Sequence, residues 1–179
     1  MTTKNKKGFT IIEVVLVLAI AGLIFLMVFI ALPALQRSQR NTQRENDLSR
    51  FLTAANDFQT NNSGKTPWKS GSTDPNFVAR YIDDSCTGTG TTFACTGDQF
   101  RDPDGSLYSF VYKGELGATT TSALSGDELK FNHNIYVWTN AGCGDENALN
   151  KGTGIRQYAM MFVLEGGVIT CDDNHLFLR

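Results

Sequence analysis

An uncharged apolar run near the amino end constrains this chain more than any other feature of its sequence. Val14 to Leu32 is 19 residues long and carries no charged side chain. A helix of that length crosses the roughly 30 Å hydrocarbon core of a lipid bilayer. One carboxylate, Glu13, directly precedes the run, and an acidic side chain inside a membrane helix costs roughly 2.5–3.5 kcal/mol. A charge retained at that cost indicates a function and a partner that neutralises it.

The apolar run belongs to a longer predicted helix, from Phe9 to about Asn61. Its first part, residues 9–35, is apolar on all sides and is predicted to lie in the membrane or in the core of an assembly. Beyond Pro33 the apolar residues recur at three- and four-residue spacing, which is typical of a helix that packs one face on another element. That stripe consists of Leu48, Phe51, Leu52, Ala55 and Phe58, and the charged residues Arg37, Arg40, Arg44, Asp47 and Arg50 are predicted to lie largely off it. Pro33 predicts a kink or a loosened turn over residues 30–33, because proline removes one helical hydrogen bond.

Residues 62–179 are predicted to form a small antiparallel β domain, called the head domain. A turn-forming segment from Asn61 to Pro67 ends the helix, and residues 76–82 are a candidate short helix. Alternating or apolar runs then predict four strands: Leu107–Lys113, Asn134–Thr139, Gln157–Leu164 and Val168–Cys171. No helical pattern separates these strands, so we expect an antiparallel meander packed on the helix stripe. The predicted fold class is therefore α+β, with a long amino-terminal helix on a small antiparallel sheet.

All four cysteines lie in the predicted head domain. An even number of cysteines in the polar part of a membrane-tethered chain predicts two disulfides formed outside the cytoplasm. Three pairings are possible, and we favour Cys86–Cys95, which closes a short loop, and Cys143–Cys171, which joins two segments near the carboxyl end. Cys-x-x-Cys is absent from the sequence, which argues against a zinc or thiol-redox site.

The stretch Lys6-Lys7-Gly8-Phe9-Thr10-Ile11-Ile12-Glu13 and the apolar run behind it resemble the amino-terminal signature of type IV pilins and pseudopilins. The resemblance extends from Lys6 to about Gln36. It implies that residues 1–8 are a cytoplasmic leader, which a prepilin peptidase removes by cutting between Gly8 and Phe9 before methylating the new amino terminus. It also implies that Glu13 pairs with the amine of a neighbouring subunit during assembly. Two opposite charges in a low-dielectric surrounding attract strongly, and either one alone is costly there.

By this resemblance the chain is a structural subunit precursor of an extracellular filament that serves motility, adhesion or DNA uptake. It would be a single-pass membrane protein before assembly and part of a filament afterwards. The implied partners are copies of itself, membrane lipid before assembly, the prepilin peptidase, an assembly platform and, through the platform, its ATPase. Two alternatives remain open: a pseudopilin of a type II secretion or competence system, and a membrane-tethered binding module that forms no filament. One departure from the commonest family pattern concerns Pro33, which lies three residues farther from Phe9 than usual.

Two simpler explanations of the amino end fit less well. An ordinary secretory signal peptide has a shorter apolar region and an Ala-x-Ala cleavage site, and Ala34 with Leu32 two positions earlier is a weak match. A plain membrane anchor leaves Glu13 unexplained, since carboxylates inside membranes are rare without a function. The three lysines of the leader favour a cytoplasmic amino end, although three arginines follow the run on its far side.

No motif predicts catalysis or a cofactor. Gly64-Lys65-Thr66 is similar to the end of a phosphate-binding loop, but it follows a predicted helix, so we interpret it as a helix-ending turn. His133 and His175 each lack a second imidazole at metal-ligand spacing, and no Gly-x-Ser-x-Gly occurs. Without the leader, 13 Lys and Arg face 18 Asp and Glu. That mild acidity argues against nucleic-acid binding, and an enzyme is not expected.

Four aspartates and one sequon are weaker candidates for sites. Asp102, Asp104, Asp172 and Asp173 offer hard oxygen ligands for calcium. Asp102-Pro103-Asp104-Gly105 is also an ordinary turn sequence, which is the favoured interpretation. Asn61-Asn62-Ser63 matches a glycosylation sequon by pattern alone.

Overall fold

The computed structural model describes residues 8–69, 72–74, 77–82, 86–87, 94–95, 100–145, 147–154 and 156–174. The chain divides into two compact units, Met1–Gln39 and Arg40–Arg179. Helix α1, Ile11–Asn61, contributes to both of them. In the first unit, the described residues from Ile11 on belong to the amino-terminal part of α1. The second unit is an α+β body that includes the rest of α1.

Helix α1 begins two residues later than predicted and ends where it was predicted to end. The carbonyl oxygen of Thr10 accepts the backbone N–H groups of Glu13 and Val14, at 3.1 and 3.3 Å, so Thr10 precedes the first turn. The helix continues through Pro33 without interruption, and the kink expected there stays a prediction. At its end Gly64, with φ of +79°, donates its N–H to the carbonyl of Gln59 at 2.8 Å. A left-handed glycine in this position is a common way to end a helix, which confirms the predicted turn.

The main sheet has four strands in the order β10-β9-β6-β5. They are β5 (Ser109–Glu115), β6 (Asn134–Thr139), β9 (Tyr158–Val163) and β10 (Ile169–Asp173), each within two residues of a predicted strand. Strand β9 pairs antiparallel with both β6 and β10, as predicted. The β9–β10 hairpin turns at Gly166 and Gly167, which both have positive φ.

The pairing of β5 with β6 differs from the expected meander, because these two strands are parallel. A parallel pair needs a crossover connection of a dozen or more residues. Residues 116–133 provide it, with the short 3₁₀ helix η2, Gly126–Leu129, on the way. A connection of this length can carry the chain back to the start of a parallel strand without forming an α-helix. The absence of a helical pattern between β5 and β6 therefore did not show that the two strands are antiparallel. The sheet is mixed, with two antiparallel contacts and one parallel contact.

Short elements surround the sheet. The π-helix η1, Val78–Ile82, occupies most of the predicted short helix, while Asn76 lies outside the described residues. The other elements within the described residues are three two-stranded antiparallel pairs: β1 (Trp68–Lys69) with β2 (Ser72–Thr73), β3 (Cys86–Thr87) with β4 (Ala94–Cys95), and β7 (Ala141–Cys143) with β8 (Leu149–Lys151).

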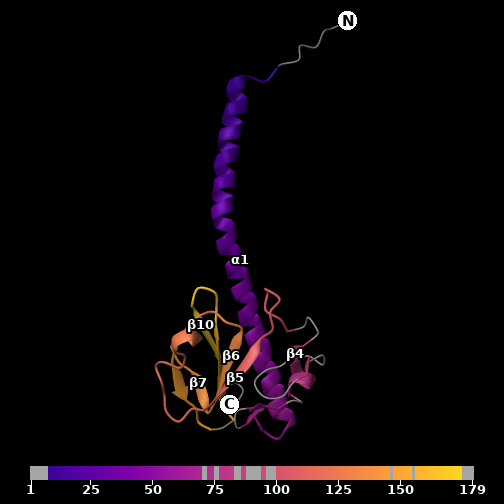
Figure 1. Ribbon diagram of the computed structural model, residues 1–179, viewed down its shortest axis with the longest axis vertical. Helices are drawn as coiled ribbons and strands as arrows, with labels where there is room; N and C mark the ends of the chain where they lie inside the picture. The colour runs from indigo at the N-terminus through magenta and orange to yellow at the C-terminus, as the bar shows by residue number, and fades with distance from the viewer. Residues whose placement is uncertain are drawn as a thin grey trace. The chain divides into compact units, whose positions relative to one another are not determined.

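The hydrophobic core of the second unit lies between α1 and one face of the sheet, where β5 and β6 lie beside the helix (Figure 1). All five residues of the predicted stripe are buried, which confirms the packing face. Phe51 is fully buried, and its ring stacks on Phe110 of β5 with centroids 4.1 Å apart. The opposite face of the sheet carries a second cluster that includes Tyr136, Trp138 and Met161. Both faces of β6 and β9 are therefore covered.

Candidate functional site

The predicted cleavage point lies in exposed, non-helical chain. Gly8, Phe9 and Thr10 precede α1, all three are exposed, and the side chain of Phe9 is 84% exposed. Nothing lies within 4 Å of a Cβ built on Gly8. A peptide bond in an exposed, non-helical segment is accessible to a protease, so the geometry permits a cut between Gly8 and Phe9. The cut itself stays a prediction.

Glu13 stands in the first turn of α1, with its side chain exposed. A carboxylate at a helix amino terminus is favoured by the unpaired N–H groups and the helix dipole, by roughly 0.3–1 kcal/mol. That gain is smaller than the cost of burying the carboxylate in an apolar surrounding without a partner. The position of Glu13 therefore leaves a need for a cationic partner once the helix is covered.

The apolar side chains that follow Glu13 form an exposed surface along the helix. Ile11, Leu23, Met27 and Ile30 are 86, 68, 73 and 73% exposed, and the large apolar residues between them are exposed as well. Among the described residues, α1 is one helix that is both long enough and apolar enough to cross a membrane. No part of its most apolar segment is buried within the chain. Contiguous apolar surface of this extent marks a membrane or protein contact. Lipid or other helices must cover it.

Where α1 enters the second unit, two arginines bind carboxylates of the head domain. Arg44 donates from Nε and Nη2 to the two oxygens of Asp102, at 2.6 and 2.7 Å, and from Nη1 to Glu165 at 2.9 Å. Arg40 donates to both oxygens of Glu165, at 2.8 and 2.7 Å. Asn41 joins them by bonding the backbone N–H and carbonyl of Glu165. We call these five residues the arginine clasp.

The electrostatics of the arginine clasp favour its ionised form. The side chains of Arg44 and Asp102 are 0% exposed. Burial alone lowers the pKa of Arg44, but the hydrogen bonds with Asp102 and Glu165 outweigh it and raise the pKa above its usual value. The hydrogen bonds from Arg40, together with those from Arg44, lower the pKa of Glu165 to about 2. The guanidinium of Arg44 also lies 4.4 Å from the ring centre of Phe131, at cation–π distance.

The clasp corrects an expectation about the charged residues of α1. Arg40 and Arg44 bind carboxylates of their own chain. Arg44 and Asp47 were predicted to lie off the packing stripe, and both are buried. Asp47 accepts a hydrogen bond from the hydroxyl of Tyr108 at 3.0 Å, so its burial does not leave the carboxylate unpaired.

The structure does not gather the four calcium candidates into one cluster. Asp102 and Asp104 lie together with His133, with potential ligand atoms within 4.8 Å of one another. Both oxygens of Asp102 are held by Arg44, and Asp104 bonds His133 Nε2 at 2.8 Å. A metal ion there would face the buried guanidinium. Burial raises the pKa of Asp104, but the Ser106 N–H and His133 outweigh burial and lower it. The protein's own groups already satisfy this pair of carboxylates.

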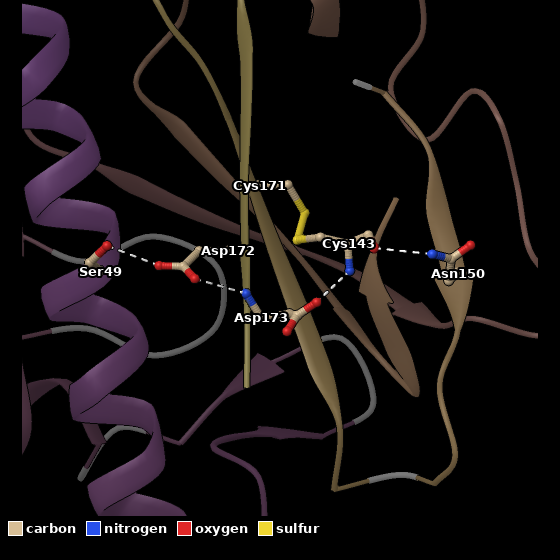
Figure 2. Close-up of a disulfide and its surroundings, with 6 residues drawn as sticks. All are labelled: Ser49, Cys143, Asn150, Cys171, Asp172 and Asp173. Carbon is tan, nitrogen blue, oxygen red and sulfur yellow. Dashed lines mark hydrogen bonds between the residues drawn. A yellow bond between two sulfur atoms is a disulfide. The ribbon is translucent and has the colours of Figure 1, made fainter. Parts of the chain in front are cut away.

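The other two calcium candidates connect α1 to a disulfide (Figure 2). Ser49 Oγ donates to Asp172 at 2.9 Å, and Asp173 accepts the backbone N–H of Cys143 at 2.6 Å. Cys143 of β7 is bonded to Cys171 of β10, with Cα atoms 5.8 Å apart. The predicted Cys143–Cys171 disulfide is therefore present. It fastens the β7–β8 pair to the edge of the main sheet.

The other predicted disulfide is tested only at the level of the backbone. Cys86 and Cys95 face each other as directly paired residues of the antiparallel strands β3 and β4. Their side chains lie outside the described residues, so this pairing stays a prediction. Two further candidates from the sequence are a histidine and a sequon asparagine. His175 lies outside the described residues. Asn61 of the sequon donates a hydrogen bond from its side chain to the hydroxyl of Tyr81 at 3.2 Å.

An exposed apolar helix of membrane-spanning length, joined to a packed α+β unit, fits a membrane-anchored protein. The family model of the prokaryotic N-terminal methylation motif matches residues 3–29. This motif is the class III signal peptide of type IV pilins and pseudopilins, and it supports a type IV pilin or pseudopilin precursor. The comparisons with curated proteins and with solved structures find no match.

Proposed function

We propose that this chain is the precursor of a structural subunit of an extracellular type IV pilus-like filament. The observation that carries the proposal is the exposed apolar helix directly behind the methylation motif. Such a helix needs a cover both before and after assembly. Lipid is the cover in the membrane, and the helices of other copies are the cover in a filament core.

Processing comes first in the proposed sequence of events. A prepilin peptidase cuts between Gly8 and Phe9 and methylates the new amino terminus at Phe9. The cut removes the basic leader and leaves a cationic amine four residues ahead of Glu13. Within an apolar surrounding, this amine and the Glu13 carboxylate of a neighbouring copy are each costly alone and attract strongly together.

Assembly then exchanges lipid for protein along residues 9–35. Packing between apolar helices is not directional, so a charge pair at a fixed position adds register to it. The partners in this step are copies of the chain, an assembly platform in the membrane and, through that platform, an ATPase in the cytoplasm. The leader starts on the cytoplasmic side, and the head domain ends outside the cell. The chain acts as a structural subunit rather than as an enzyme.

The test is the chemical state of the subunit in filaments sheared from the cell surface. Mass spectrometry of the intact subunit is expected to show a chain that begins at methylated Phe9. An intact leader on the mature protein would refute the proposal. A chain with Gly8→Ala supplies the matched variant, since it changes the cleavage residue and leaves the apolar helix unaltered.

Two other functions share the same processing step, and the location of the product distinguishes them. A pseudopilin of a secretion or competence system would carry the same methylated Phe9 but remain in a short assembly below the cell surface. A membrane-tethered binding module would remain monomeric in the membrane. Electron microscopy of surface filaments, labelled with an antibody to the head domain, separates the pilus subunit from both. Motility, adhesion and DNA uptake are then compared in a deletion strain.

A further inference from the structure

A small layer of three segments covers the face of the main sheet that is turned away from α1. The segments are β7, β8 and residues 119–124 of the crossover between β5 and β6. Thr120 and Leu149 exchange two backbone hydrogen bonds, at 2.9 and 2.8 Å, and the side chain of Asn147 bonds the N–H and the carbonyl of Leu124. In the described chain, residues 119–124 form no hydrogen bond with a strand of the main sheet. We call the three segments together the lid.

The lid contacts the sheet through apolar side chains. Leu124, Ala141 and Leu149 are 0% exposed and belong to the same cluster as Tyr136 and Trp138 of β6. Burying one leucine side chain completely favours the closed position of the lid by roughly 10- to 100-fold. The two leucines therefore hold the lid closed most of the time, and a detached lid exposes the aromatic side chains of β6.

One end of the lid is fixed to the sheet by the backbone. Asn140, which links β6 to β7, has a φ of +54°, and its carbonyl accepts the N–H of Gly152, the residue after β8, at 2.7 Å. A Cβ on Gly152 would lie 2.6 Å from the carbonyl carbon of Asn140, so this close approach requires glycine. Asn140 and Gly152 are therefore the hinge of the lid.

A covalent bond fastens the lid away from this hinge. Cys143, the last residue of β7, lies three residues from Asn140, roughly 10 Å along a strand, and is bonded to Cys171 of β10 (Figure 2). The N–H of Cys143 also donates to the carboxylate of Asp173, at 2.6 Å. While the disulfide is intact, the lid cannot leave the sheet unless β10 separates from β9 as well.

We propose that the Cys143–Cys171 disulfide is a redox lock on the lid. When the two sulfurs are oxidised, the lid detaches only when the second unit unfolds as a whole. When they are reduced, the lid detaches by itself, while α1 and the main sheet keep their packing. The oxidation state of one cysteine pair thus decides whether the face of β6 under the lid can be exposed. The proposal concerns the second unit alone and does not depend on filament assembly.

The unlocking reagent is a dithiol such as dithiothreitol. Neither Cys143 nor Cys171 is fully buried, so a small thiol can approach their bond. One thiolate of the reagent attacks one sulfur, which breaks the S–S bond and releases the other cysteine as a thiolate. The second thiol of the reagent then displaces the first cysteine and closes a cyclic disulfide. Two electrons pass from the reagent to the protein, and its two protons end on the two cysteines.

The test is hydrogen exchange of the full, isotope-labelled chain in detergent micelles, followed residue by residue by NMR. A pair of strands without a sheet beneath it is marginally stable, so a detached lid also loses its internal hydrogen bonds. The lid is read from the backbone amides of Thr120, Leu124 and Leu149, and the core from those of Ala55 and Met160. The measured quantity is the ratio of lid exchange to core exchange, each corrected for its intrinsic rate. This ratio is insensitive to a change in global stability, which alters both rates alike.

In the oxidised protein, lid and core amides are expected to exchange within about threefold of each other, since both need global unfolding. After dithiothreitol, the lid amides are expected to exchange at least about tenfold faster than the core amides, because two buried leucines resist opening less than the whole core does. Reoxidation with oxidised glutathione should restore the first ratio. A ratio that is the same in both redox states overturns the proposal, and so does a change that reoxidation fails to reverse.

Variants assign the effect to this cysteine pair. Cys143→Ala with Cys171→Ala is expected to show the high ratio without any reagent and to be insensitive to dithiothreitol. The matched control is Cys86→Ala with Cys95→Ala, which should keep the low ratio until dithiothreitol is added. A high ratio in the oxidised control overturns the proposal.

A packing variant tests whether the lid moves against the sheet. Leu124→Ala is expected to raise the ratio of the reduced protein at least about tenfold further, because this buried side chain holds the lid closed. An unchanged ratio in the reduced Leu124→Ala protein shows that the lid amides exchange by another route and contradicts the lid.

Discussion

Replacing Arg44 by alanine measures how strongly the arginine clasp holds α1 in the second unit. The change leaves Asp102, whose side chain is 0% exposed, without the two N–H donors that now lie 2.6 and 2.7 Å away. Removing one partner of a buried ion pair costs roughly 3–5 kcal/mol, because the other charge stays buried and unpaired. Glu165 keeps its two hydrogen bonds to Arg40, so its contribution to the stability of the second unit is largely retained. A loss of about 4 kcal/mol is a large share of a typical unfolding free energy of 5–15 kcal/mol.

Urea unfolding of the full chain in detergent micelles, followed by tryptophan fluorescence, is the assay. Trp68 and Trp138 are both buried in the second unit and report its unfolding. With a slope of roughly 2 kcal/mol per molar urea, the midpoint is expected to fall by about 1.5–2.5 M. Lys130→Ala, in an exposed ion pair, is the control and should change the unfolding free energy by no more than about 0.5 kcal/mol.

A double substitution separates the cost of an unpaired charge from the cost of lost packing. Arg44→Met with Asp102→Leu replaces the buried pair by apolar side chains and is expected to recover most of the stability that Arg44→Ala loses. The reasoning is refuted if Arg44→Ala shifts the midpoint no further than Lys130→Ala does. It is also refuted if the double variant is as unstable as the single one.

Three further outcomes are expected. Glu13→Ala should leave cleavage between Gly8 and Phe9 intact, by mass spectrometry, but lower the amount of subunit recovered in sheared filaments; normal incorporation would remove the assembly role of this carboxylate. The folded-state pKa of Glu165, about 2, lies below its usual value of 4.5, so its contribution to stability is present above pH 4.5 and is lost as the pH falls toward 2; urea midpoints across that range should fall less in Glu165→Gln than in the parent. Replacing Cys143 and Cys171 by alanine opens a 28-residue separation and should cost about 3.5 kcal/mol by chain entropy, measured by urea unfolding; a cost below about 1 kcal/mol would contradict it.

Local patterns in the sequence predicted α1, the four strands of the main sheet and most of η1, but not the short strand pairs or η2. The 3–4 spacing of Phe51, Ala55 and Phe58 predicted the packing face of α1, and all three are buried. The direction of β5 was not predictable in the same way. Strand direction depends on how far the connecting segment reaches, and residues 116–133 reach far enough for a parallel return without forming an α-helix. Periodicity describes which face a residue occupies and carries no information about that distance.

The clasp shows a second limit of pattern analysis. Arg44 stands four residues before Leu48 and seven before Phe51, so the helix period places it on the packing face. Its charge argued for an exposed position, because arginine is rarely buried unless it is paired. Its partners, Asp102 and Glu165, are 58 and 121 residues away in the chain. An ion pair between residues so far apart in the sequence can be recognised only from the folded structure.

The arginine clasp also has a mechanical consequence. A pull on the chain from the side of residues 11–39 reaches the second unit at Arg40 and Arg44, before it reaches the hydrophobic core that starts at Leu48. Asp102 precedes β5, which is one edge strand, and Glu165 lies in the turn that leads into β10, which is the other. Tension is therefore shared between the two edges of the sheet, and ionic bonds carry it ahead of the packed aromatic rings.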